Sequence, residues 1–386
     1  MILRLERCGM KFAHIGDLHI GKRVHDFSML EDQQYILSRI LEWVHKEKPD
    51  VLILAGDIYD KAVPSAEAVS LFDWFLTELA DRACPVCIVS GNHDSAERLA
   101  FGARLMNARN IFLSPVYEGK VETVDFKDSF GRIRIHLLPF VRPLSVRHAF
   151  PKEAEGIVDY QTALRTAVEH MELLEGERNV LAAHQFITGA MSCESEEVTV
   201  GGLDNGDASL FDAFDYVALG HIHSPQSVGR KEVRYCGTPL KYSFSEVSQE
   251  KSITVVELEE KGNVQIKTLP LIPLRDMRKI RGTYMEVTDR AFYEGTDQQD
   301  YIQVTLTDEE DIPDGLQKLR TIYPNIMRLE YDNRRTRKDA EIREWEKQEE
   351  LSELELFSRF YEQQNNQPMS PEQEAFVKHI MEEIKE

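Results

Sequence analysis

Short runs of apolar residues alternate along this chain with longer segments in which apolar residues recur every three or four positions. The runs lie at residues 12–15, 51–55, 86–89, 180–183 and 216–219. Runs of this length are typical of buried strands, whereas the longer spacing predicts amphipathic helices from about residue 28 and over residues 64–80. The alternation of strands and helices predicts an α/β domain with much parallel pairing.

The helical segments carry two further local signals. The tetrapeptide from Ser28 to Glu31 has the pattern of a capping box, which predicts the beginning of the first helix. The spacing within the second helix predicts which side chains face the core. These are Val69, Phe72, Phe75, Leu76 and Leu79.

The pattern of predicted elements and the composition of the sequence change after about residue 273. Strands are predicted at residues 301–306 and 326–331, with a helix over about 313–323 between them. From residue 337 the chain is charged and helical in composition, and two short amphipathic blocks lie within it. We therefore expect a domain over residues 10–273, a small domain over 274–336 and a helical segment over 337–386. The two blocks either pack on their own domain or dock on a partner helix, and the polarity of their outer faces favours docking.

Polar residues that can bind metal ions follow the ends of the five apolar runs. They are Asp17 and His19, Asp57 and Asp60, Asn92 and His93, His184, and His221 and His223. In an open α/β sheet, ligands bind at the carboxyl ends of the strands, where residues distant in sequence converge. Carboxylates, an amide and imidazoles without thiolate are suited to Mn²⁺, Fe²⁺ or Zn²⁺, and disfavour a structural zinc site.

Each of these patterns alone is more often an ordinary turn, but their occurrence at five strand ends predicts a dinuclear metal site. Two ions about 3.5–4 Å apart can clamp a phosphate and activate a water molecule. The imidazole of His93 can protonate a leaving group near neutral pH. The sequence therefore predicts a metal-dependent phosphoesterase.

The order of the five motifs resembles the calcineurin-like metallophosphoesterase superfamily. Several stretches resemble its SbcD nuclease branch in more detail, namely residues 28–33, 200–202, 214–223 and 237–246. This resemblance implies a two-sheet sandwich flanked by helices, followed by a small α+β capping domain and, in this chain, a C-terminal helical extension.

The resemblance also implies roles for the individual residues. One metal ion would be bound by Asp17, His19, Asp57 and His223, and the other by Asp57, Asn92, His184 and His221, so that Asp57 bridges them. His93 would be the catalytic histidine, oriented by Asp60. The implied cofactor is two divalent ions, most simply Mn²⁺. The implied activity is cleavage at DNA ends and hairpins in DNA repair and recombination, as a homodimer with the coiled-coil ATPase SbcC.

The net charge of −21 counts against a simple DNA-binding protein, because phosphate neutralisation usually requires a basic surface. An acidic chain is better matched to a small-molecule phosphoesterase, such as a nucleotidase or cyclic-nucleotide phosphodiesterase with the same metals. A catalytically inactive scaffold is a third possibility, which the intact ligand set opposes. The SbcD-like stretches and the long C-terminal segment favour the nuclease.

The composition of the chain indicates the cellular compartment in which we expect the protein. No apolar run approaches the roughly 20 residues that cross a bilayer, and no signal-length apolar segment follows the N-terminus. The five cysteines are an odd number without framework spacing, which favours a reducing compartment. We therefore expect a cytoplasmic protein with no membrane partner. The Cys84–Cys87 pair has the spacing of a redox motif, but it precedes a strand rather than a helix, which disfavours a reactive thiol.

Overall fold

The computed structural model describes residues 2–5, 7–196 and 206–337, together with 357, 358, 361, 369–371, 373, 374, 376–378 and 380. Residues 200–202 and most of the predicted helical segment over 337–386 lie outside these described residues. The chain divides into two compact units. The first holds Met1–Lys279, Asp297–Gln303 and Tyr323–Arg328, and the second holds Ile280–Thr296, Val304–Ile322 and residues from Leu329 on. The domain boundaries expected from the sequence stay predictions.

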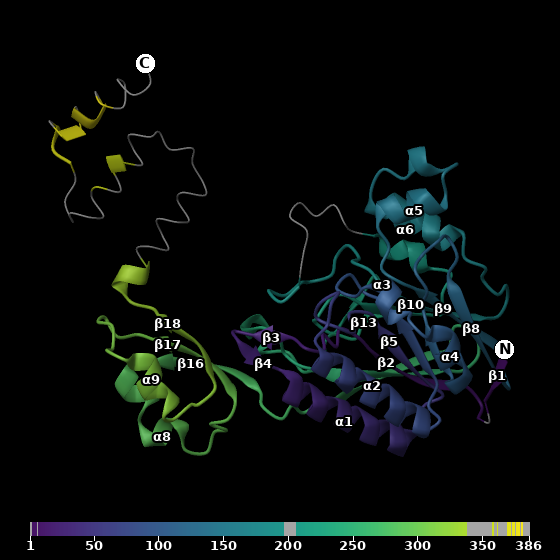
Figure 1. The fold of residues 1–386 in the computed structure, drawn as a ribbon, viewed down its shortest axis with the longest axis horizontal. Coiled ribbons are helices and arrows are strands. Elements are labelled where there is room, and N and C mark those ends of the chain that lie inside the picture. The colour runs from purple at the N-terminus through teal and green to yellow at the C-terminus, as the bar shows by residue number, and fades with distance from the viewer. Residues whose placement is uncertain are drawn as a thin grey trace. The chain divides into compact units, whose positions relative to one another are not determined.

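Two sheets form the centre of the first unit (Figure 1). One has six strands, in the order β15 (Val264–Pro270), β14 (Ser252–Leu258), β2 (Met10–Ile15), β5 (Val51–Ala55), β6 (Val86–Val89) and β7 (Ile111–Leu113). The other has seven, in the order β1 (Ile2–Arg4), β8 (Glu122–Asp128), β9 (Gly131–Leu138), β10 (Arg178–His184), β11 (Tyr216–Gly220), β13 (Arg230–Tyr235) and β12 (Gln226–Val228).

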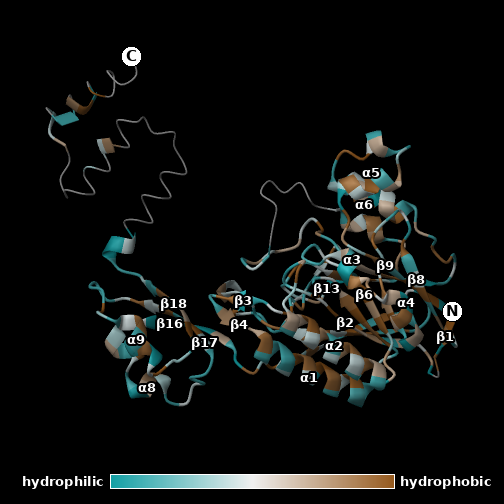
Figure 2. Ribbon diagram, viewed as in Figure 1, coloured by the Kyte–Doolittle hydropathy of each residue, from teal (hydrophilic) through white to brown (hydrophobic). Residues whose placement is uncertain are grey.

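The two sheets pack against each other and are covered by helices on their outer faces. The core between the sheets contains alternate residues of β2 and β5 together with residues of β9, β10 and β11. A second core joins the six-stranded sheet to α1 (Leu30–Glu47) and α2 (Ala66–Asp81). A third joins the seven-stranded sheet to α5 (Pro143–Ala149) and α6 (Tyr160–Glu169). Figure 2 shows the central strands largely in the colour of apolar residues. The predicted sandwich flanked by helices is confirmed.

Parallel pairing explains where the functional loops lie. The strands β2, β5, β6 and β7 are parallel to one another, and β9, β10, β11 and β13 are parallel within the other sheet. Parallel neighbours end at the same edge of a sheet, so the loops that follow them lie together. Three short connecting elements follow β6, namely α3 (Ala96–Leu99), α4 (Ala103–Met106) and the 3-10 turn Asn107–Arg109.

Two local predictions about the helices are wrong. No side chain caps α1, which begins at Leu30 after Met29. The residue at the cap position is Met29, whereas Ser28 belongs to β4 (Phe27–Ser28), which pairs with β3 (Arg23–Val24), and its Oγ atom accepts only a long hydrogen bond of 3.5 Å from the N–H of Leu30. On α2, Val69 is 45% exposed, because the buried stripe includes Ala68 and leaves Val69 at its margin.

The second unit contains the last three residues of each strand of a small sheet, whose strand order is β16 (Met277–Gly282), β17 (Tyr301–Leu306) and β18 (Ile326–Tyr331). Its helices are α7 (Tyr284–Val287), α8 (Arg290–Tyr293) and α9 (Gly315–Arg320). The two strands expected after residue 300 are present with the predicted bounds, whereas α9 is shorter at both ends than predicted. No helix in the described part of the chain is long and apolar enough to cross a membrane.

Candidate metal centre

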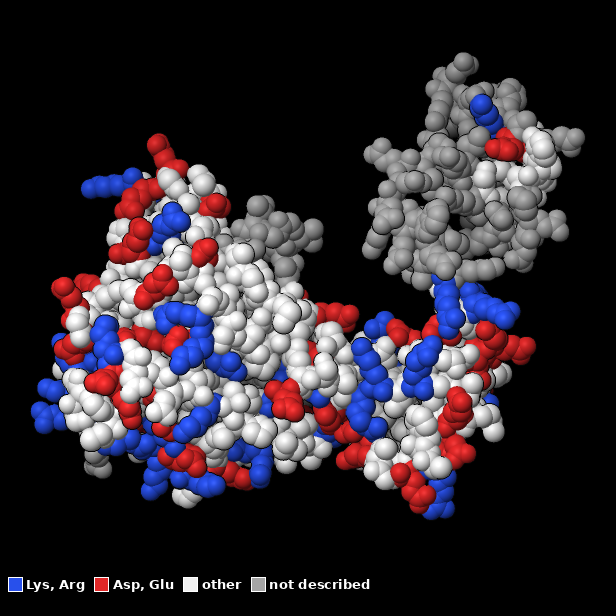
Figure 3. Space-filling view, turned by 180° about the vertical axis from the view of Figure 1, so that it is seen from behind, with Lys and Arg blue, Asp and Glu red and all other residues white. Residues whose placement is uncertain are grey.

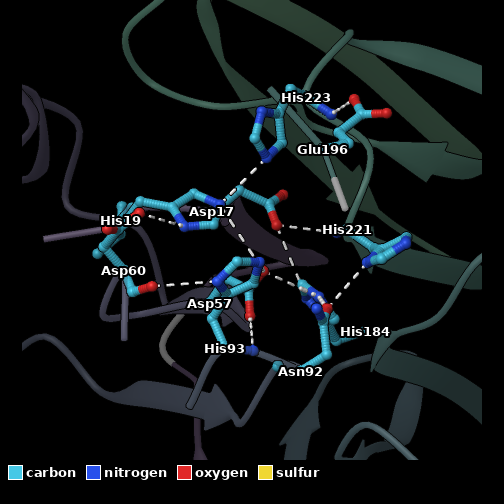
Figure 4. Close-up of polar contacts among 12 residues, drawn as sticks. Asp17, His19, Asp57, Asp60, Asn92, His93, His184, Glu196, His221 and His223 are labelled. Atoms are coloured by element: carbon cyan, nitrogen blue, oxygen red, sulfur yellow. Dashed lines mark hydrogen bonds and ion pairs between the residues drawn. The ribbon is translucent and has the colours of Figure 1, made fainter. Parts of the chain in front are cut away.

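The candidate ligands lie on loops that follow parallel strands of both sheets (Figure 4). Asp17 and His19 come after β2, Asp57 after β5 and Asn92 after β6. The other sheet contributes His184 as the last residue of β10, and His221 and His223 after β11. The structure brings all seven predicted ligands together, each within 4.0 Å of another member of the set.

Asp57 lies at the centre of this group. Its Oδ2 atom is 3.4 Å from Nε2 of His184 and 3.7 Å from Nε2 of His19. Nε2 of His19 is in turn 3.1 Å from Nε2 of His223. One carboxylate therefore faces histidines on two sides, as a bridging ligand requires.

Asn92 completes the other half of the group. Its side-chain oxygen lies 3.0 Å from Nε2 of His184 and 3.0 Å from Nδ1 of His221. Nδ1 of His184 donates a hydrogen bond of 2.9 Å to the carbonyl oxygen of Ala55. Since Nδ1 donates in this bond, Nε2 is the ring nitrogen directed at Asn92 and Asp57, and it is the atom that would coordinate a metal ion.

The backbone at these positions is strained. Four of the seven candidate ligands have positive φ angles without being glycine: Asp17 at 53°, His19 at 44°, Asp57 at 46° and His221 at 104°. Such conformations cost of order 1–3 kcal/mol each and persist where the surrounding structure enforces them. Their concentration in one group of side chains indicates a functional site.

Close approach to these ligands requires glycine at neighbouring positions. A Cβ atom on Gly56 would lie 2.2 Å from Nδ1 of His184, and one on Gly91 would lie 2.0 Å from Oδ1 of Asp57. Neither distance is compatible with a side chain. The glycines of the Gly-Asp and Gly-Asn-His motifs thus leave room for the ligands of the adjacent strands.

Burial and charge make the group suitable for cations. Asp17, His19, Asp57 and His184 are at most 2% exposed, and among the described residues Oδ2 of Asp17 and Nδ1 of His19 have no hydrogen-bond partner. Burial lowers the pKa of His221 to about 3 and holds the pKa values of His19 and His223 well below their usual range. These imidazoles are therefore neutral and able to coordinate a cation.

His184 differs from the other histidines. Burial alone would lower its pKa, but the adjacent carboxylates of Asp57 and Asp17 raise it to about 9. The carboxylates of Asp57 and Asp17 thus favour a positive charge at His184. Buried carboxylates and convergent neutral imidazoles fit divalent metal ions. Among the described residues, three overlapping groups have the spacing of a metal site: Asp17, His19 and His223; His19, Asp57 and His93; and Asp17, Asp57 and His184.

Comparisons with known proteins agree with this geometry. Residues 10–225 match the calcineurin-like phosphoesterase family, and residues 273–365 match the C-terminal family of SbcD, described as the type 5 capsule protein repressor C-terminal domain. The chain is 32% identical over 379 residues to the SbcD subunit of the nuclease SbcCD from Staphylococcus epidermidis, an alignment that covers 96% of this chain and 98% of that protein. This chain belongs to the SbcD family.

Two solved structures are more distant neighbours of this SbcD-family chain. A dimetal phosphatase from Danio rerio is 13% identical, with 69% of this chain and 100% of that one covered and a TM-score of 0.39. The protein TT1561 of Thermus thermophilus is 12% identical, with 67% and 99% covered and a TM-score of 0.37.

The two remaining candidate residues of this SbcD-family protein lie beside the ligands. His93 donates from Nδ1 to the main-chain carbonyl oxygen of Asp60 over 3.0 Å, and its Nε2 faces Oδ2 of Asp57 at 4.0 Å. The carboxylate of Asp60 binds the ammonium group of Lys22 at 2.8 Å instead. Asp60 therefore contacts His93 through its backbone.

Asp94 is the last residue of the motif that begins at Gly91, and the sequence assigned it no role. Its carboxylate accepts hydrogen bonds from the backbone N–H groups of Ile58, Tyr59 and Gly91, at 2.9–3.1 Å. It thereby ties the loop after β5 to the loop after β6. Because burial together with the nearby Asp57 raises the pKa of Asp94 to about 6, these three donors stabilise a carboxylate that burial disfavours. The signal in the sequence is its place in the motif Gly91-Asn92-His93-Asp94, which does not indicate this bracing role.

Proposed function

We propose that this SbcD-family chain is a metal-dependent DNA nuclease that hydrolyses phosphodiester bonds at DNA ends and hairpins. It would act as the nuclease subunit of a complex with an SbcC-like ATPase. The observation that carries the proposal is the convergence of seven candidate oxygen and nitrogen ligands from five strand ends, in a chain 32% identical over nearly its whole length to a nuclease subunit.

The proposed ligand sets share Asp57. One ion would be held by Asp17, His19, Asp57 and His223, and the other by Asp57, Asn92, His184 and His221. The short distances from Asp57 to His19 and His184 support the shared role. Two divalent ions so placed supply charge that stabilises the phosphate and lowers the pKa of an attacking water molecule. Mn²⁺ suits the mixture of carboxylate, amide and imidazole ligands.

His93 is proposed as the group that protonates the leaving oxygen. Its Nδ1 is fixed by the carbonyl of Asp60, so the ring is oriented with Nε2 toward the proposed ligands. The backbone N–H of His93 also donates to Oδ1 of Asp57 at 2.9 Å, which holds the two residues in a fixed relation. A general acid of this kind contributes typically 10²- to 10⁴-fold to the rate.

We propose that partner proteins provide part of the DNA-binding surface. The chain carries a net charge of −21, and acidic and basic side chains are interspersed on the face shown in Figure 3. We propose that residues 337–386 dock on the SbcC-like ATPase, that residues 274–336 form a capping domain and residues 10–273 the nuclease domain, and that the chain forms a homodimer.

The proposal is tested by comparing three substrates with Mn²⁺ and with a chelator. A linear duplex, a DNA hairpin and a simple aryl phosphodiester are incubated with the protein, with and without the partner ATPase and ATP. We expect all three to be hydrolysed with Mn²⁺ and none with chelator. Rapid cleavage of the aryl ester with both DNA substrates intact, even in the complex, would instead identify a small-molecule phosphoesterase. Hydrolysis of none of the three despite bound metal would identify a scaffold.

A further inference from the structure

A buried chain of polar side chains lies against the ring of His223, on the ring edge opposite His19. The Oγ atom of Ser195 is 2.7 Å from Nδ1 of His223 and 2.6 Å from Oε1 of Glu246. The other carboxylate oxygen of Glu246 is 2.6 Å from the ammonium nitrogen of Lys251. Glu246 is fully buried and Lys251 is 5% exposed, so this ion pair is removed from solvent.

The direction of each hydrogen bond in this chain follows from the groups at its far end. An ammonium group only donates, and an ionised carboxylate only accepts. Lys251 therefore donates to Glu246, and the hydroxyl of Ser195 must donate its single proton to the other oxygen of Glu246. That leaves Ser195 only lone pairs for His223, so Nδ1 of His223 must carry a proton and donate it.

When Nδ1 of neutral His223 carries the proton, Nε2 has an unprotonated lone pair. This nitrogen is the one that lies 3.1 Å from Nε2 of His19. The ion pair of Glu246 and Lys251 thus sets the tautomer of the histidine through one serine hydroxyl, and the tautomer it sets is the one a metal ligand requires.

The backbone of His223 is held by the same group of side chains. Its N–H donates to Oε1 of Glu196 at 2.6 Å, and its carbonyl accepts from Lys251 at 2.9 Å. Lys251 uses its third proton on the side-chain oxygen of Gln249 at 2.8 Å. All three protons of the Lys251 ammonium group are therefore used in hydrogen bonds. The ring of His223 is held at Nδ1, and its backbone is held at the N–H and at the carbonyl oxygen.

Both oxygen atoms of the Glu246 carboxylate also accept several hydrogen bonds. Besides Ser195 and Lys251, it accepts from the backbone N–H of Tyr242 at 3.2 Å and from the hydroxyl of Thr238 at 3.4 Å. A buried ion pair is weak evidence for stability, since an apolar pair of similar volume is often equally stable. The complete set of directed contacts around one histidine is better explained by a need to orient that histidine.

We propose that Ser195, Glu246 and Lys251 are positioning residues that fix the tautomer and orientation of His223 for metal binding. The role rests on the proposed function, because it assumes that His223 is a ligand. It extends the site to a serine, a glutamate and a lysine that touch no metal ion themselves. Partners of this kind typically contribute 10- to 100-fold to metal affinity.

The most informative variant is Ser195→Ala. It removes one hydroxyl and leaves the Glu246–Lys251 ion pair intact, so the fold should be preserved. Ser195→Thr restores the hydroxyl. Ser245→Ala is the matched control, because Ser245 lies beside Glu246, is exposed, and among the described residues forms hydrogen bonds with Glu194 and Ser243 but not with His223, Glu246 or Lys251.

Two measurements are made on each protein. The ¹⁵N shifts of the His223 ring in metal-free protein report the tautomer, with the signals assigned through His223→Gln. Titration with Mn²⁺ reports the affinities of both ions. We expect Ser195→Ala to lose the pure Nδ1–H tautomer and to bind one of the two ions 10- to 100-fold more weakly. We expect Ser195→Thr to restore both properties and Ser245→Ala to match the wild type.

The outcomes separate this inference from the proposed function. Unchanged tautomer and unchanged Mn²⁺ affinities in Ser195→Ala would overturn the positioning role, as would a wild-type His223 without a proton on Nδ1. Failure of the wild type to bind two ions would overturn the proposed function, and it would be seen before any variant is compared. A drop in melting temperature without change in tautomer or affinity would show that the network serves the fold alone, and would also overturn the inference.

Discussion

Replacing Gly91 by alanine perturbs the proposed bridging ligand without altering any ligand itself. The new Cβ atom would lie 2.0 Å from Oδ1 and 2.4 Å from the backbone nitrogen of Asp57. Side-chain rotation of Asp57 cannot relieve both contacts, because one of them involves the main chain. The φ angle of Gly91 is outside the left-handed region, so the effect of the substitution is steric.

The size of the displacement follows from these distances. Contacts to a Cβ atom shorter than 3.0 Å essentially do not occur, so Asp57 and the loop after β6 must separate by about 1 Å. A misplacement of about 1 Å can cost roughly 10²-fold in rate. Asp57 also accepts the hydrogen bond from the backbone of His93, so the same shift displaces the proposed general acid.

The assay combines Mn²⁺ titration with the kcat/KM for an aryl phosphodiester. Gly91→Ala should bind at least one ion more weakly and lose about 10²-fold or more in kcat/KM. Gly156→Ala is the matched control, because nothing lies within 4 Å of its added Cβ atom and its φ angle is not in the left-handed region. Thermal unfolding of both variants checks the fold. Near-native activity of Gly91→Ala with two bound ions would refute the steric reasoning.

Three further predictions concern single residues. His93→Ala should retain both ions and lose about two to four orders of magnitude in rate, and a loss of metal stoichiometry would contradict its role as an acid. Asp57→Ala should empty both metal sites and His223→Ala mainly one, so near-native binding of two ions by Asp57→Ala would overturn the ligand assignment. Burial raises the pKa of the Cys84 thiol to about 12, so iodoacetamide at pH 8 should label the exposed Cys8 and leave Cys84 unmodified until the protein unfolds. Equal labelling rates in folded protein would contradict this.

The strands and the candidate ligands were predictable for the same reason. A strand buried on both faces appears in the sequence as a short continuous apolar run, so the bounds of β5 and β6 follow from the sequence. The polar loops after them converge because the pairing is parallel. The start of α1 does not follow from the capping pattern, since Ser28 pairs with Arg23 in a short hairpin and the helix begins at Leu30 after Met29.

The network behind His223 could not be predicted from spacing. Ser195 precedes the residues that lie outside the described part, Glu246 lies in the 3-10 turn Phe244–Glu246, and Lys251 precedes β14. No periodicity links these positions, and only tertiary contact brings them to one imidazole. The sole signal in the sequence is the SbcD-like stretch at residues 237–246, which indicated importance without indicating a role.

The central claim, that two divalent ions share Asp57 in one centre, is tested most directly by anomalous diffraction from crystals grown with Mn²⁺. The account predicts two anomalous peaks about 3.5–4 Å apart, one on each side of the Asp57 carboxylate. His19 and His223 should contact one peak, and His184 and His221 the other. A single peak, or peaks that Asp57 does not contact, would contradict the account.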